Sequence, residues 1–364
     1  MKALRYIVAL LGIVTTVACN STTHHPLDTT SLYTPRYAKY FEVVTDNRSG
    51  ERLLCIKNPW QGAEDVAYYA PIDSLAAQHI VAMSSSYVAM LDAIGCTDRI
   101  TAISGCRFIS TPSARRAIDE GRIVEAGYNT TLDFESFKQR HADLVLLYGV
   151  AGEAKSTTDK LDALHIPYLY IGDYLEEEPL GRAEWIVALA YVCDCEELGK
   201  SIFAEIETRY IALRDQQMCH TGRPRVMLNL PYRDSWFMPS TESYAVRLIE
   251  DAGGEYIYTK GKGNASKSIS LEEALLLASR SDVWLNLGQV SSLDELRRAA
   301  PRFADIKAVR EGRIYNNIKR STPSGGSDFW ESGSIRPDIV LADLVKILHH
   351  KAPTDSLYYY TKLE

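Results

Sequence analysis

Two stretches of this sequence align with each other without a gap, LDFESFKQRHADLVLLYG at residues 132–149 and LEEALLLASRSDVWLNLG at residues 271–288. In each, a segment with helical spacing of apolar residues runs into a short apolar run and ends at a glycine, which predicts a helix followed by a buried strand. A weaker correspondence pairs residues 87–95 with residues 244–253. Because the order of elements repeats along the chain, the sequence predicts a duplicated α/β lobe.

Each aligned stretch begins just after a hydroxyl residue that has an acidic residue three positions further on. The first pair is Thr130 and Asp133, and the second pair is Ser270 and Glu273. This spacing is typical of a capping box, in which the two side chains satisfy free amide groups at a helix N-terminus. We therefore expect a helix to begin after each hydroxyl residue.

Short apolar runs alternate with helical patterns in both halves of the chain. The runs of the first half are residues 79–83, 100–103, 142–148 and 168–171, and alternation resumes at residues 225–230. Repeated strand–helix units indicate parallel sheets with helices on their faces. Between the halves, residues 181–217 have helical spacing and no strong breaker except Gly199, so we expect one long helix with a kink near Gly199.

The first nineteen residues differ from the rest of the chain. Lys2 and Arg5 precede an apolar run at residues 6–17, which has the length of an export signal and is too short to span a bilayer. The run leads into TVAC at residues 16–19. Small residues before a cysteine resemble a bacterial lipoprotein cleavage site, although a threonine stands where leucine is usual. We expect lipidation at Cys19, with an ordinary signal peptide cut nearby as the alternative.

The segment between the signal and the first lobe has two parts. Residues 20–40 are rich in Ser, Thr, His, Pro and Tyr, which favours a tether, and β-prone runs at 40–44 and 52–56 flank a turn-rich stretch, which predicts a hairpin. The predicted fold is α/β, with two Rossmann-like lobes joined by a single long helix. Its parts are a signal peptide at 1–19, a tether and β-hairpin extension at 20–78, an N-terminal α/β lobe at 79–180, a linking helix at 181–220, a C-terminal α/β lobe at 221–350 and a tail at 351–364.

Composition and charge exclude some classes of partner. Hydrophobic residues make up 46% of the 364 residues and charged residues 24%, as in globular proteins with substantial cores. The net charge is −7 and no basic run exceeds two residues, so we expect no nucleic-acid partner, because binding phosphates needs a clustered positive face. No later run reaches about 18 apolar residues, so we expect membrane attachment only through the lipid.

Six cysteines remain besides Cys19. They are Cys55, Cys96, Cys106, Cys193, Cys195 and Cys219. Export permits disulfides, but their pairing cannot be read from a sequence. The pair Cys193 and Cys195 falls within a helical pattern without a second pair of cysteines, so the sequence predicts neither a metal site nor a redox site there.

Two lobes joined by one helix predict a clamshell whose cleft lies at the carboxyl ends of the strands. The candidate ligand-binding residues follow predicted strand ends or lie near the last helix: Ser84, Ser85, Arg107, Tyr128, Tyr148, Tyr232, Arg233, Trp236, Trp330 and Arg336. Aromatic rings supply broad contact area, and arginine pairs with carboxylate or catecholate oxygens. A helix N-terminus after the serines can receive an anion. This mixture is typical of a site for a large, flat or anionic ligand.

Several segments together resemble the iron-siderophore/vitamin B12 periplasmic-binding family, the helical-backbone type of ABC-transporter substrate-binding protein. They are residues 80–84, 90–95, 98–100, 142–146, 328–333 and 336–344. The resemblance covers roughly residues 79–350, and residues 20–78 lie outside the family core. It implies a monomeric, non-enzymatic protein that needs no cofactor and carries an iron complex, a ferric siderophore or haem. A corrinoid is the alternative ligand.

The resemblance also implies how the protein meets its transporter. Members of the family present one glutamate from each lobe to arginines of a permease dimer in the inner membrane. The matching positions here are Glu135 in the first lobe and Glu250 in the second. The expected location is the periplasm, with a lipid anchor at Cys19.

Other functions fit the sequence less well. A zinc or manganese site would need histidines at strand ends, whereas the position after the first strand holds serines at 84–86. GxSxG, HExxH and GxGxxG are absent, and the glycines at 261 and 263 lack the spacing of a phosphate-binding loop. An exported adhesion module and an exported hydrolase remain as alternatives.

Overall fold

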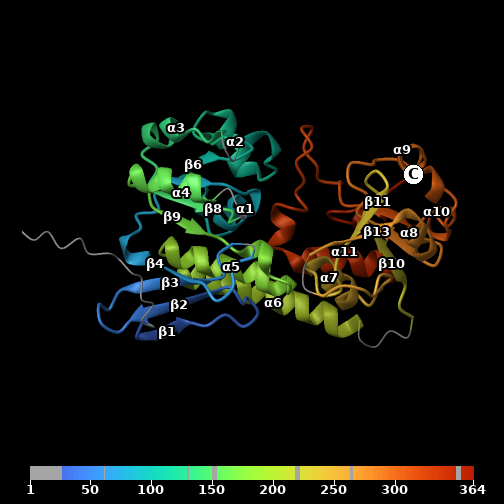
Figure 1. Cartoon of the computed structure of the whole chain (residues 1–364), viewed down its shortest axis with the longest axis horizontal. Helices are drawn as coiled ribbons and strands as arrows, with labels where there is room; N and C mark the ends of the chain where they lie inside the picture. Colours follow the sequence, from blue (N-terminus) through green and yellow to red (C-terminus); the bar gives the residue numbers. More distant parts are fainter. Residues whose placement is uncertain are drawn as a thin grey trace, which may run out of the picture.

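The computed structural model describes residues 27–60, 62–128, 131–149, 154–217, 222–262, 265–349 and 354–364. Two α/β lobes stand side by side, and helices α5 (Pro179–Val192) and α6 (Glu196–Gln217) run beneath them (Figure 1). A small β-sheet lies below the N-terminal lobe, next to these helices. The predicted α/β fold with two lobes and an N-terminal β extension is therefore confirmed.

The N-terminal lobe is built on a parallel sheet with the strand order β7-β6-β5-β8-β9. Its elements are β5 (Ile80–Ala82), α1 (Ser85–Ala93), β6 (Ile100–Ile103), α2 (Pro112–Asp119), β7 (Val124–Glu125), α3 (Phe134–Gln139), β8 (Leu144–Leu147), α4 (Ala154–Ala163) and β9 (Tyr168–Tyr170). Every residue of β5 and β8 is buried, as expected for central strands covered by helices on both faces.

The C-terminal lobe has a sheet with the order β12-β10-β14-β15-β16, in which β16 is antiparallel to its neighbour. A separate antiparallel pair, β11 and β13, lies beside it. The elements are β10 (Arg225–Leu228), β11 (Ser235–Met238), α7 (Tyr244–Asp251), β12 (Glu255–Tyr256), β13 (Lys267–Ser270), α8 (Leu271–Ala278), β14 (Val283–Leu285), α9 (Leu293–Ala299), α10 (Lys307–Arg310), β15 (Ile314–Asn316), α11 (Pro337–His349) and β16 (Thr361–Lys362).

The two lobes share one topology. The order β6-β5-β8-β9 in the first sheet recurs as β12-β10-β14-β15 in the second, so the predicted duplication is confirmed. Helix α8 is capped as predicted, since the Ser270 hydroxyl accepts a hydrogen bond from the Glu273 amide at 3.2 Å. Helix α3 is capped instead by Asp133, which accepts from the Ser136 amide at 3.0 Å; Thr130 lies outside the described residues.

The linker is a pair of packed helices, so the prediction of one long helix kinked near Gly199 is wrong. The chain breaks at Asp194, which has a left-handed φ of 54°, and the Cys195 amide closes the turn on the Ala190 carbonyl at 2.8 Å. Gly199 marks a close helix contact, because a Cβ there would lie 2.3 Å from the Ala190 Cβ. The glycine allows α6 to pack against α5.

The N-terminal extension is more extensive than a hairpin. The predicted strands pair as β2 (Phe41–Asp46) and β3 (Arg52–Lys57), and β1 (Thr29–Tyr33) and β4 (Ala67–Pro71) complete an antiparallel sheet. The described part of the predicted tether is folded onto the linker. Three successive amides from Arg36 to Ala38 each donate to the buried Glu184 carboxylate of α5 at 2.8 Å.

The C-terminal segment likewise belongs to a lobe and is not a free tail. Its described residues include β16, and the Asp343 carboxylate of α11 accepts hydrogen bonds from the amides of Tyr358 at 2.8 Å and Tyr359 at 2.7 Å. Among the helices of the described residues, none combines the length and the apolar character needed to cross a bilayer.

Candidate ligand-binding cleft

An aromatic cavity of about 270 Å³ opens at the carboxyl ends of β5, β6 and β8 in the N-terminal lobe. Four of the predicted residues line it: Ser84, Ser85, Tyr128 and Tyr148. Phe108 and Tyr170 add further rings to its wall. Strand ends of an open α/β sheet are where ligands bind, so the structure brings these four residues together at the predicted place.

The serines place a helix N-terminus at this cavity. The Ser84 hydroxyl caps α1 by accepting a hydrogen bond from the Ser86 amide at 3.4 Å, and its oxygen lies 3.0 Å from the Ser86 hydroxyl. The capped end carries the partial positive charge of the helix. This part of the wall therefore favours a polar or anionic ligand group.

Two tyrosines leave ring surface available to a ligand. Tyr148 is 41% exposed and Tyr128 is 44% exposed, although both line the cavity. Tyr148 packs against Tyr174 in a tilted arrangement with ring centroids 4.4 Å apart, and the Tyr174 hydroxyl donates to the Gly149 carbonyl at 2.6 Å. The Tyr148 ring is thereby fixed, which limits the conformational entropy that ligand stacking would cost.

A second pocket of about 550 Å³ lies between the lobes and is strongly cationic. Arg107 and Arg115 line it from the N-terminal lobe, and Lys319 and Arg320 line it from the C-terminal lobe. Among the described residues that line it, Asp328 alone is acidic. The excess of positive charge favours an anionic ligand or an anionic part of a ligand.

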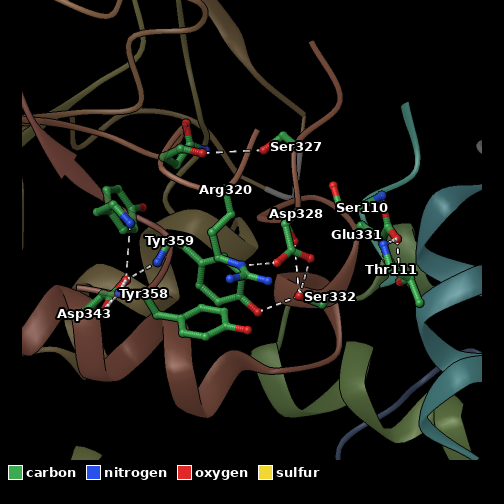
Figure 2. A network of polar contacts seen from close by, with 12 residues as sticks. Ser110, Thr111, Arg320, Ser327, Asp328, Glu331, Ser332, Asp343, Tyr358 and Tyr359 are labelled. Carbon is green, nitrogen blue, oxygen red and sulfur yellow. Dashed lines mark hydrogen bonds and ion pairs between the residues drawn. The ribbon is translucent and has the colours of Figure 1, made fainter. Parts of the chain in front are cut away.

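Two cations of this pocket, Arg320 (Figure 2) and Lys319, are held in place by neighbouring groups. Arg320 forms an ion pair with the buried Asp328, whose other oxygen accepts a hydrogen bond from the Ser332 hydroxyl at 2.6 Å. The Arg320 guanidinium also lies 4.4 Å from the centre of the Tyr358 ring. Lys319 donates to the Leu357 carbonyl at 2.5 Å. Their positions therefore depend little on the ligand.

The same pocket lies beside a direct contact between the lobes. Glu331, fully buried, accepts hydrogen bonds from the amides of Ser110 and Thr111 at 2.7 Å each and from the Thr111 hydroxyl at 2.5 Å (Figure 2). Burial raises the pKa of the Glu331 carboxyl above its usual value. Close by, a Cβ on Gly326 would lie 1.9 Å from the Phe108 carbonyl oxygen. The two lobes are therefore in contact at the cationic pocket.

Sequence reasoning found Arg107 of this group and missed Arg115, Lys319 and Arg320. Arg115 lies within α2, and Arg320 lies in a turn-rich segment after β15. Neither directly follows a predicted strand, and only the contact between lobes brings them together. The adjacent basic residues at 319 and 320 were the one local signal.

Trp236 does not line the cleft and that prediction is corrected, whereas Arg336 lies outside the two pockets. Trp236 is fully buried, donates from Nε1 to the Leu228 carbonyl at 2.8 Å and packs on Phe303. Strand β11 turns this ring into the core. Arg336 forms a two-pronged ion pair with the buried Asp338 at 2.9 Å, which holds it at the start of α11.

Three further candidates lie on the C-terminal lobe outside the two pockets. Tyr232 is 62% exposed in the turn before β11, and the Arg233 guanidinium lies 5.3 Å from its ring centre. Trp330 is 54% exposed and packs edge-on against Phe329 with centroids 4.8 Å apart. They remain accessible to a ligand that extends beyond the pockets.

The candidate docking glutamates are both exposed, Glu135 on α3 and Glu250 on α7. Glu250 lies 3.7 Å from Arg247, which also pairs with Glu178 at 3.1 Å. Cys19 lies outside the described residues. Within the described part of the chain, no group of three or more His, Cys, Asp or Glu side chains is placed to hold a metal ion.

Two similar lobes on a helical base, with a pocket at the strand ends and another between the lobes, define a ligand-capturing protein of the clamshell type. Residues 80–317 match the periplasmic binding protein family. The chain belongs to that family, which confirms the predicted resemblance and the assignment of a binding protein rather than an enzyme. Membership places the chain among extracytoplasmic binding proteins.

Solved structures agree with this fold. A periplasmic haem-binding protein from Pseudomonas aeruginosa matches with a TM-score of 0.60 and 16% identity, over 79% of this chain and 98% of that one. A periplasmic vitamin B12-binding protein of Vibrio cholerae matches with a TM-score of 0.53 and 16% identity, over 76% of this chain and 98% of that one. At such identities the likeness concerns the fold.

Curated relatives include an uncharacterized lipoprotein of Methanocaldococcus jannaschii, 25% identical over 286 residues. The match covers 75% of this chain and 65% of that relative. A second uncharacterized lipoprotein of the same organism is 24% identical over 70% of this chain and 65% of its own length. The chain thus spans about 65% of the length of these two relatives.

Proposed function

We propose that this protein captures an anionic iron complex, haem or a ferric siderophore, and delivers it to an ABC permease. The observation that carries the proposal is the aromatic cavity beside a cationic pocket. Ile109 lines both, so the two spaces adjoin. A ligand with a flat or aromatic body and peripheral carboxylate or catecholate oxygens would fill both.

The aromatic cavity and the cationic pocket suit different parts of such a ligand. The exposed rings of Tyr128 and Tyr148 offer stacking surfaces. Arg107, Arg115 and Arg320 offer planar groups that match pairs of anionic oxygens. Some of the solved structures with this fold are described as haem-binding proteins. Cobalamin carries amides in place of carboxylates on its ring. It would therefore gain less electrostatic binding energy from the four cations that line the second pocket.

Delivery and location complete the proposal. Glu135 and Glu250 are exposed carboxylates on different lobes, so a partner that contacts both would sense the relative position of the lobes. Two relatives are named lipoproteins, which supports a lipid anchor at Cys19. The protein would then act at the periplasmic face of a membrane, as a monomer.

The test is calorimetric titration with haem, a ferric catecholate, a ferric hydroxamate and cobalamin. We expect saturable, sub-micromolar binding of one iron complex. Arg107→Ala should weaken it by at least about tenfold, because a charged hydrogen bond is lost. Arg116→Ala is the matched control, since this arginine is exposed on α2 and does not line either pocket.

Each other outcome would redirect the assignment. Binding of cobalamin alone would favour the corrinoid function. Equal losses in Arg107→Ala and Arg116→Ala would show that general charge, and no specific pocket, attracts the ligand. An absence of binding to all four compounds would contradict the proposal and point to a ligand of another class.

A further inference from the structure

Three cysteines from distant parts of the chain meet at one place in the structure. Cys96 follows α1 in the N-terminal lobe, and Cys193 and Cys195 flank the turn between α5 and α6. All three thiols are free in this structure, and the Cys96 thiol interacts with both of the others. The sequence pattern suggested an isolated pair inside a helix, whereas the turn brings the pair to a third cysteine.

Backbone contacts fix the two segments against each other. The Cys96 amide donates to the Leu91 carbonyl at 2.8 Å, and the Cys195 amide donates to the Ala190 carbonyl at 2.8 Å. Arg99 crosses between the segments, because its guanidinium donates to the Cys193 carbonyl at 3.3 Å. The thiols are therefore neighbours because of the fold itself and not because of side-chain freedom alone.

Burial and charge distinguish the three thiols. Cys193 is 1% exposed and Cys96 is 5% exposed, whereas Cys195 is half-buried. The hydrogen bond from Cys193, aided by the charge of Arg99, lowers the pKa of Cys96 to about 6. Burial raises the pKa of Cys195 to about 11. At neutral pH, Cys96 is thus the thiolate of the group, and a thiolate is the form that attacks a disulfide.

We propose that Cys96 and Cys193 form a disulfide when the exported chain folds, which ties the N-terminal lobe to the turn of the linker. The compartment outside the cytoplasm is oxidising and lets disulfides persist. The inference rests on the extracytoplasmic location and is independent of the ligand.

The oxidant is an external disulfide, either a small molecule such as oxidised glutathione or a thiol oxidoreductase. The Cys96 thiolate attacks one sulfur of that disulfide and expels the other as a thiolate, which leaves a mixed disulfide on Cys96. Cys193 gives its proton to a thiolate or to solvent and attacks Cys96 Sγ, which expels the second carrier thiolate. Two protein thiols and one external disulfide thus become one protein disulfide and two external thiols.

Such a bond would matter because it closes a loop of about 100 residues, and long loops restrict the unfolded chain most. The loop contains most of the N-terminal lobe and all of α5. We expect a reductant to lower the midpoint of thermal unfolding by at least about 5 °C. Ligand affinity should change little, since none of the three cysteines lines either pocket.

The test uses the full chain exported to an oxidising compartment. The protein is denatured without reductant, alkylated with iodoacetamide, digested and analysed by mass spectrometry. We expect a linked peptide pair containing Cys96 and Cys193, with Cys195 alkylated. Alkylation of both Cys96 and Cys193, even after refolding with oxidised glutathione, would overturn the proposal. A link from Cys96 to Cys195 would overturn the stated pairing.

Variants separate a disulfide from simple packing. Cys96→Ser and Cys193→Ser should each abolish the effect of reductant on the unfolding midpoint. Cys55→Ser is the matched control, because Cys55 is buried on β3 and none of the three cysteines is among the groups that act on its thiol, and it should retain the full effect. A midpoint in the unsubstituted protein that does not respond to reductant would contradict the proposal, whatever the variants do.

Discussion

The hydroxyl oxygen of Tyr128 lies so close to Gly105 that a Cβ at this glycine would approach it to 2.5 Å. Gly105 also has a left-handed φ of 84°, where any side chain is strained. Both residues line the aromatic cavity, with Gly105 just beyond the end of β6. The position of the Tyr128 ring therefore depends on the absence of a side chain at Gly105.

Gly105→Ala should displace Tyr128 and weaken haem binding by roughly tenfold, a loss of about 1.4 kcal/mol. Calorimetric titration with haem measures this loss. Gly121→Ala is the control, because Gly121 has a similar φ of 71° but no atom within 4 Å of its added Cβ. Both variants should lose about 1 kcal/mol of stability from backbone strain, and only Gly105→Ala should lose affinity. Equal affinities in the two variants would refute the role of Tyr128.

Removal of the Glu331 carboxylate should loosen the contact between the lobes. Glu331→Ala leaves the amides of Ser110 and Thr111 without their buried acceptor, which costs about 2–4 kcal/mol. We expect a larger radius of gyration in small-angle scattering without ligand, and weaker haem binding, because Arg107 and Arg320 would no longer line one pocket. The exposed Glu311→Ala is the control and should scatter as the unsubstituted protein does.

The buried Glu176 should make stability depend on pH. Burial raises the pKa of its carboxyl from 4.5 to about 7, despite hydrogen bonds from the amides of Lys39 and Tyr40. Between these two values the folded state binds a proton that the unfolded state does not. Stability from this group is therefore present below pH 4.5 and is lost as the pH rises to about 7.

Denaturant unfolding at pH 5 and pH 8 measures this effect. The contribution of Glu176 should make the protein about 3 kcal/mol more stable at pH 5. Glu176→Gln should remove that difference, whereas Glu177→Gln, which loses only the exposed ion pair with Lys39, should keep it. An identical pH profile for both variants would assign the effect to other groups.

The contact between α5 and α6 should be intolerant of added volume. Gly199→Ala places a methyl group 2.3 Å from the Ala190 Cβ, and overpacking of this kind costs about 1–3 kcal/mol. The double variant Gly199→Ala with Ala190→Gly should recover part of the loss, as chemical denaturation would report. Without any recovery, Gly199 would act through the backbone and not through this contact.

The lobes were predictable because their information is local. Apolar runs such as residues 144–147 and 283–285 mark buried strands wherever they fold, and Ser84, Tyr128 and Tyr148 follow strand ends directly. Arg115 and Arg320 were missed because only the contact between the lobes brings them to one pocket.

The errors have the same origin. Trp236 follows a strand end in sequence, but the extra strand β11 turns its ring into the core. The break between α5 and α6 lies at Asp194, which has a left-handed φ. Gly199 lies inside α6, where it allows close packing against α5 and does not kink the helix. Partners from distant parts of the chain leave no periodic signal in a sequence.

The last prediction concerns the permease. Glu135→Ala combined with Glu250→Ala should leave haem affinity unchanged, because both carboxylates are exposed and neither lines a pocket. The same variant should abolish uptake in cells that rely on this protein, since the contact with the permease would lose a charge on each lobe. The control combines Asp98→Ala and Asp305→Ala, whose side chains are 93% and 92% exposed, and should support normal uptake. Normal uptake by the glutamate variant would place the docking surface elsewhere, while equal loss in both variants would point to net charge as the cause.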